Sequence, residues 1–151
     1  MFRKLLGDAM MMRTPVVGIE TWGHKDRASR EVRDMERSLE RAVSRRIGEM
    51  SVVALPVEDE PGPRSLRGFI ERNAIALLSG YVDACIDPPS RDWLGFYSTR
   101  ERVRRSGLWN SNHVEETPDP AFHATLRDLV AEAPKIPRGS RLHGHSPCSR
   151  D

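Results

Sequence analysis

The sequence predicts an α+β fold that is mostly helical and carries a small β-sheet. Several segments place apolar residues at the three- and four-residue spacing of amphipathic helices, and one short segment, residues 51–57, is rich in β-branched residues. The chain of 151 residues has the length of one domain. We expect this domain over residues 1–132 and a disordered tail over residues 133–151, which have too few apolar side chains to order themselves.

Two helices and an extended piece are predicted in the first third of the chain. Residues 2–13 form a helix with one apolar side, and its abrupt start without a cap suggests that sequence is missing upstream. Residues 16–20 are expected to be extended. The next helix covers residues 29–47 and ends at Gly48. Its apolar face consists of Val32, Met35, Leu39, Ala42, Val43 and Ile47.

The other side of this second helix carries an arginine at every fourth position. This arginine ridge consists of Arg33, Arg37, Arg41 and Arg45. Two interpretations are open. The ridge is a solvated helix face, which we favour because exposed helices commonly carry many charges, or it follows the phosphates of a nucleic acid.

The predicted β-sheet is built on residues 51–57, where Pro56 indicates an edge or the end of a strand. The strongest helix pattern follows over residues 65–79, with Gly80 as its stop. Asn73 lies within the apolar face of that helix and needs hydrogen-bond partners. The same face is expected to pack against Leu39, Val43 and the strand, through Leu66, Phe69, Ile70 and Leu77.

Residues 93–114 combine tryptophan, arginine, asparagine and histidine without the regular period of a core element, which is typical of a ligand-facing loop. Ser98 and Glu101 predict a capping box for a helix over residues 99–106, and Gly107 predicts its left-handed end. The candidate nucleic-acid-binding residues are Arg100, Arg102, Arg104, Arg105, Trp109, Asn110, Asn112 and His113. The arginines suit phosphates, the indole can stack on a base, and the last three can bond to base edges or phosphates.

A second interpretation of residues 93–114 is structural. In it, Trp109 and its neighbours pin an irregular loop to the core, and the short charged helix is solvated. A last helix is expected to begin with Asp119 as its cap and Pro120 in its first turn. Its apolar side consists of Phe122, Leu126, Leu129 and Val130.

Composition limits the cellular setting and the partners. The formal net charge is only +2, so no global field attracts nucleic acid. The two cysteines form no metal-binding or disulfide pattern, which fits a reducing cytoplasm, and no apolar run has the length of a membrane span. His143, His145 and Cys148 could bind a metal, but we favour a disordered tail.

Three motifs in combination resemble the C-terminal half of a bacterial group of GIY-YIG nuclease-like proteins. They are E-D-E-P-G-P-x-S-L-R-G-F-I-E-R-N-A-I-A-L-L-S, D-P-P-S-x-x-W-L-G and R-x-R-V-R-R-S-G-L-W-N-x-N-H-V, and the resemblance spans about residues 2–130. In that superfamily, two tyrosines on paired strands and a helical arginine surround the attacking water and the phosphate. A glutamate from a later helix holds a divalent cation. The resemblance therefore implies that Glu71 is a ligand of Mg²⁺.

The chain departs from the family pattern on the nucleophile side. No G-I-Y or Y-I-G strand pair precedes Glu71, and Tyr81 and Tyr97 follow it, so neither tyrosine takes the family role. We therefore expect a truncated domain that is inactive as this chain. Three functions remain: a nuclease relic with weak or no binding to nucleic acid, a metal-dependent nuclease completed by another chain, and a protein-interaction module.

Overall fold

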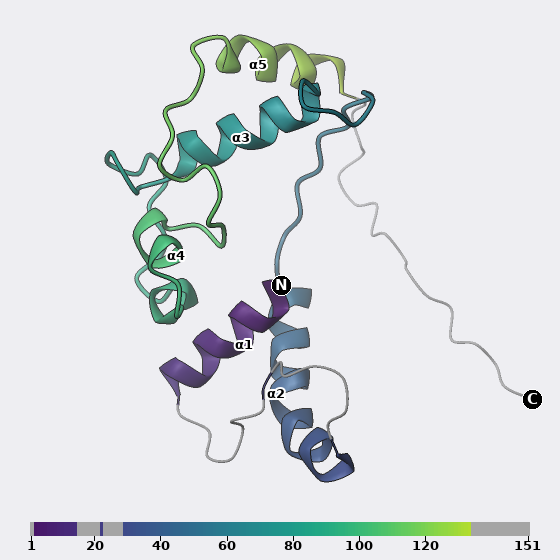
Figure 1. Ribbon diagram of the computed structural model, residues 1–151, viewed down its shortest axis with the longest axis vertical. Coiled ribbons are helices and arrows are strands. Elements are labelled where there is room, and N and C mark those ends of the chain that lie inside the picture. The colour runs from purple at the N-terminus through teal and green to yellow at the C-terminus, as the bar shows by residue number, and fades with distance from the viewer. Residues whose placement is uncertain (1, 15–21, 23–28, 134–151) are drawn as a thin grey trace, which may run out of the picture.

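The computed structural model describes residues 2–14, 22 and 29–133, and within these it is helical (Figure 1). The elements in chain order are α1 (Phe2–Arg13), α2 (Arg30–Gly48), α3 (Leu66–Leu78), the 3-10 helix η1 (Leu94–Tyr97), α4 (Glu101–Ser106) and α5 (Phe122–Glu132). No strand occurs among the described residues, so the expected β-sheet is wrong. The fold class is helical rather than α+β over this part of the chain.

Residues 51–57, the predicted strand, form an irregular connection between α2 and α3. Val52 and Val53 are 88% and 96% exposed, so the side chains of these two valines lie almost wholly in solvent. A β preference reflects packing on a pleated surface, and a segment without a neighbouring strand has no ladder to join. The end of the connection is held by Arg67 of α3, whose guanidinium donates to the carbonyl oxygens of Val57 and Asp59.

The main apolar core lies where α1 packs against α2 and η1. Its buried residues are Leu6, Ala9, Trp22, Leu39, Val43 and Leu94. The Trp22 indole donates a hydrogen bond of 3.1 Å to the carbonyl oxygen of Lys4 and lies against Gly7, where a Cβ would overlap the ring. On the rim, Arg3 of α1 forms an ion pair with Glu40 of α2.

The helix starts predicted for α2 and α3 are confirmed. The hydroxyl oxygen of Ser29 accepts from the backbone N–H of Val32, and that of Ser65 accepts from the N–H of Gly68 at 3.1 Å. Each serine satisfies one donor that the first helical turn leaves unpaired. Gly48 is the last residue of α2, and Met35 on the expected apolar face is 48% exposed.

Helix α3 packs against α5, and the two lie side by side in Figure 1. The expected packing of α3 against Leu39 and Val43 is therefore wrong, because those residues are covered by the α1 and η1 core. The rings of Phe69 and Phe122 meet edge to face, with centroids 6.4 Å apart. Phe122 is fully buried, whereas Phe69 is only half-buried.

Asn73 has the partners that its buried position requires. Its side-chain N–H₂ group donates to the carbonyl oxygen of Phe69 at 2.8 Å, and its oxygen accepts from the backbone N–H of Asp119 at 2.6 Å. The amide thus ties α3 to the turn that leads into α5. The Asp119 carboxylate accepts from the N–H of Ala121, and α5 begins at Phe122, later than predicted.

Several sequence predictions lie outside the described residues. They are the extended piece at 16–20, almost all of the tail at 133–151 and the histidines and cysteine within it. Among the described helices, none combines the length and the apolar character needed to cross a bilayer.

Candidate nucleic-acid interface

Helix α4 is anchored by its inner face. Val103 and Ser106 are fully buried, and Gly107 closes the helix in the left-handed conformation with a φ of 74°. The predicted end of this helix is confirmed, but the capping box is wrong. The helix begins at Glu101 and its cap position has no side-chain hydrogen bond; the Ser98 hydroxyl instead accepts from the backbone N–H of Arg100 at 3.2 Å.

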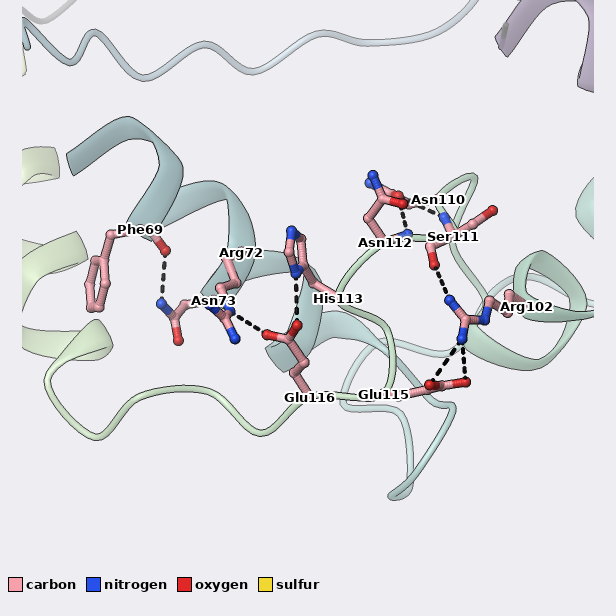
Figure 2. Close-up of polar contacts among 10 residues, drawn as sticks. All are labelled: Phe69, Arg72, Asn73, Arg102, Asn110, Ser111, Asn112, His113, Glu115 and Glu116. Atoms are coloured by element: carbon pink, nitrogen blue, oxygen red, sulfur yellow. Dashed lines mark hydrogen bonds and ion pairs between the residues drawn. The ribbon is translucent and has the colours of Figure 1, made fainter. Parts of the chain in front are cut away.

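The four α4 arginines, Arg100, Arg102, Arg104 and Arg105, all have partners within the protein. Arg102 donates to the carbonyl oxygen of Ser111 and forms an ion pair with Glu115, both at 3.1 Å (Figure 2). Arg100 donates to the Ser111 hydroxyl at 3.4 Å. These contacts fold the loop after α4 back onto the helix.

The other two α4 arginines contact residues that precede α4 in the chain. Arg104 donates to the carbonyl oxygen of Ser98, which precedes the helix. The Arg105 guanidinium lies over the ring of Tyr81, 4.0 Å from its centroid, and donates to the hydroxyl of the same tyrosine at 3.1 Å. It also lies 3.5 Å from the Glu101 carboxylate. The α4 arginines therefore hold α4 and its flanking segments together.

Trp109 packs into an aromatic cluster at the edge of the main core. Its ring centroid lies 5.7 Å from that of Phe2 and 5.5 Å from that of Trp93. The indole thus joins the loop after α4 to α1 and to the start of η1. This arrangement corresponds to the structural interpretation of the tryptophan.

Asn110, Asn112 and His113 shape the loop that follows. The side-chain oxygen of Asn110 accepts from the backbone N–H groups of Ser111 and Asn112, at 2.6 and 2.9 Å, which closes a turn. Asn112 is exposed. His113 has a φ of 59°, which is uncommon for a residue other than glycine.

His113 belongs to a three-residue polar link that the sequence did not reveal. Its Nδ1 donates to the Glu116 carboxylate at 2.8 Å, and the same carboxylate accepts from Nε of Arg72 on α3 (Figure 2). The hydrogen bond from His113, followed by that from Arg72, lowers the pKa of Glu116. Arg72 and Glu116 are 44 positions apart, so no local pattern could have indicated the pair.

A hollow of about 490 Å³ lies beside this polar link. Its walls come from α3 and from the loop before α5, and they include Phe69, Arg72, Asn73, Glu116, Thr117 and Asp119. The lining is a mixture of an aromatic ring, a guanidinium and carboxylates. Because the Arg72 guanidinium is already paired with Glu116, the hollow offers no unpaired cation from that residue.

Glu71, the candidate metal ligand, lies exposed on α3. Within the described ranges no hydrogen bond or ion pair engages its carboxylate. Two other acids near this helix do form ion pairs, Asp59 with Arg67 at 3.1 Å and Glu116 with Arg72. Among residues 2–14, 22 and 29–133, no group of three His, Cys, Asp or Glu side chains is arranged to hold a metal ion.

Comparison with known families decides the relationship. A model of the GIY-YIG domain matches residues 1–136, which is most of the chain. The chain belongs to the GIY-YIG domain family. No curated protein and no solved structure gives a significant match.

The two tyrosines of this GIY-YIG domain both follow α3 in the chain. Tyr81 holds Arg105 through its ring and its hydroxyl, and Tyr97 ends η1 with 43% of its surface exposed. Glu71 does fit one part of a magnesium site. Mg²⁺ in nucleic-acid enzymes is commonly held by one or two carboxylates plus substrate oxygens and water, and an exposed, unpaired carboxylate can serve as one of these ligands.

Proposed function

We propose that this GIY-YIG domain is of nuclease type and acts on nucleic acid, with Glu71 as the carboxylate that binds Mg²⁺. We further propose that residues 1–151 alone do not hydrolyse phosphodiester bonds. The observation that carries the proposal is the availability of Glu71. The neighbouring acids Asp59 and Glu116 are bound to arginines, while the Glu71 carboxylate faces solvent without a partner in the described part of the chain.

The chemistry explains why one carboxylate is not enough. When bound, Mg²⁺ neutralises charge on the phosphate and on the leaving oxygen. Hydrolysis also needs a group that takes a proton from the attacking water. The family supplies tyrosines for the nucleophile side, and in this chain Tyr81 and Tyr97 both follow Glu71, with Tyr81 engaged by Arg105. Glu71 therefore contributes to metal and substrate binding rather than completing the reaction.

Contact between residues 100–113 and nucleic acid stays a prediction. The side chains of Arg102 and Arg105 are each 51% exposed, so their outer edges remain open to a phosphate. Asn112 is also exposed. A phosphate at these arginines would compete with Glu115 and Glu101 for the same guanidinium groups.

A test of the metal role compares three proteins: the wild type, Glu71→Gln, and Glu132→Gln as a control at an exposed glutamate on α5. Binding to a short DNA duplex is measured with Mg²⁺ and with EDTA. We expect Mg²⁺ to strengthen binding by the wild type and by Glu132→Gln, and to have no effect on Glu71→Gln. An unchanged Mg²⁺ response in Glu71→Gln would exclude Glu71 as the ligand.

The same three proteins test hydrolysis. Incubation with plasmid DNA or with single-stranded RNA, in Mg²⁺ or Mn²⁺, should leave the nucleic acid intact in every case. If the wild type cut the substrate and Glu71→Gln did not, the proposal that this chain is inactive alone would be overturned, while the metal role of Glu71 would be supported.

A second candidate function is a protein-interaction module, and one observation favours it. Residues 51–57 carry two almost fully exposed valines on a backbone that has no strand beside it among the described residues. Such a segment can add to another strand. We take the occupant to be the same segment of a second copy, because antiparallel pairing of identical segments closes a two-fold dimer. Light scattering of the wild type and of Val53→Lys checks this, since a monomer at all concentrations would exclude it.

A further inference from the structure

The arginine ridge lies on the solvent side of α2. Leu39 and Val43 face the core with 5% and 0% of their surfaces exposed. At 100° per residue, the row of Arg33, Arg37, Arg41 and Arg45 is centred roughly 160° away from them. All four arginines are exposed. The ridge is therefore a row of cations that winds gradually, by about 40° per step, over the outer face of a helix.

Three of the four ridge side chains have no partner in the part of the chain that the structure describes. Arg37 is paired with Asp34 at 2.6 Å, but no hydrogen bond or ion pair engages the guanidinium groups of Arg33, Arg41 or Arg45 there. Glu40, an acid close to the ridge, forms its ion pair with Arg3 of α1 instead. With respect to residues 2–14, 22 and 29–133, the ridge thus presents three unpaired guanidinium groups to the solvent.

We propose that the arginine ridge binds the phosphate backbone of nucleic acid. This inference rests on the proposed function, in that the domain acts on nucleic acid, and it names the surface that holds the polymer. Successive ridge residues are about 6 Å apart along the helix axis, and the four span about 18 Å. A regular row of cations suits a polymer with regularly repeated anions. Guanidinium groups also bind phosphate oxygens in pairs, which an ammonium group does not.

The composition of the face favours a phosphate polymer over a protein. Between and beside the ridge arginines the outer face carries Arg30, Asp34 and Ser44, with no apolar side chain. Protein interfaces are usually built around a buried apolar or aromatic centre, which this face lacks. Contacts to phosphates need no such centre, and they fix the position of the nucleic acid without reading its sequence.

The test compares two triple variants with the same change in charge. In the ridge variant, Arg33, Arg41 and Arg45 are replaced by Gln; in the control, Arg64, Arg91 and Arg127 are replaced by Gln. The control arginines are exposed and have no partner in the described part of the chain. Each set lowers the formal net charge from +2 to −1. Neither set breaks an ion pair, so both variants should keep the melting temperature of the wild type.

Binding to a fluorescent DNA duplex is measured between about 50 and 200 mM salt. The salt slope is the fall in log affinity per unit of log salt concentration, and three lost phosphate contacts reduce it by about 2.7. Over this fourfold range of salt, the factor by which affinity falls should therefore be about 40 times smaller for the ridge variant than for the wild type. The control should keep the wild-type slope. Equal salt slopes for the two variants would overturn the proposal that the ridge binds phosphates, while leaving intact the proposal that the domain binds DNA. No salt-dependent binding by the wild type would overturn the ridge together with the nucleic-acid part of the proposed function; the metal role of Glu71 would then be judged by direct Mn²⁺ titration.

Discussion

Two groups of arginines in this protein look alike in sequence and differ in structure. The α4 arginines are dense, with four cations in six residues, and each contacts a carbonyl, a hydroxyl, a carboxylate or a ring of the protein. The arginine ridge of α2 is spread over three turns, and the side chains of three of its four members form no hydrogen bond or ion pair with the described residues. The density of charge in a sequence therefore does not indicate which cations are available to a ligand.

The difference has a local cause. Helix α4 is followed by a loop that folds back and brings Ser111 and Glu115 within reach of Arg102. The inner side of helix α2 packs on the core that it forms with α1 and η1, and its outer side faces solvent. An arginine next to irregular backbone finds carbonyl oxygens to bind, whereas a regular helix has already paired its own carbonyl oxygens. We therefore expect the α4 arginines to act on stability and the ridge to act on the binding proposed above.

The largest expected effect tests whether the region around α4 is structural. Trp109→Ala removes an indole that packs on Phe2 and Trp93, and because this side chain is half-buried the variant should lose about 2–3 kcal/mol of stability. Urea unfolding measures the loss. The affinity for DNA of the folded variant should equal that of the wild type. Lost DNA binding with an unchanged free energy of unfolding would instead mark Trp109 as a stacking residue.

A smaller effect concerns the polar link between α3 and the loop after α4. Hydrogen bonds from His113 and Arg72 lower the pKa of Glu116 in the folded protein. A carboxyl with a lowered pKa stabilises the fold above its unfolded pKa of about 4.3, and this stabilisation is lost as the pH falls through the lower folded value.

Replacement by glutamine isolates this contribution. Glu116→Gln should melt below the wild type at neutral pH, and the gap between the two melting curves should close on acidification below about pH 4. Thermal unfolding followed by circular dichroism at a series of pH values checks it. A gap that stays constant across the series would show that the ionised carboxylate is not what stabilises the link.

The sequence predicted the helices well where the signals are local. The starts of α2 and α3, which the structure shows to be capped by Ser29 and Ser65, and the glycine that ends α4 depend on residues within one turn, and all three occur where expected. The strand at residues 51–57 was wrong because β-branched residues form a strand only when another strand is beside them. The partner helix of α3 was also wrong, since apolar periodicity gives the buried face of a helix but not the element that covers it.

The candidate site shows the same limit. Glu71 was predicted from a motif, and the structure adds that it is exposed and unpaired among the described residues, which the motif alone does not tell. Arg102 binds Ser111, 9 positions away, and Arg105 binds Tyr81, 24 positions away, so these contacts depend on how the loops fold. Charge patterns thus predicted where arginines gather, and only the fold indicates which of them have partners.

The most direct test of the contrast between the two groups is the salt slope of DNA binding measured for two single variants, with unfolding free energies determined in parallel. Arg41→Ala should lower the slope by about 0.9 and leave stability unchanged. Arg102→Ala should leave the slope unchanged and cost about 0.5–1 kcal/mol, because its contacts to Ser111 and Glu115 are partly exposed. The reverse pattern, a lower slope for Arg102→Ala and an unchanged slope for Arg41→Ala, would contradict the account and return the nucleic-acid contact to α4.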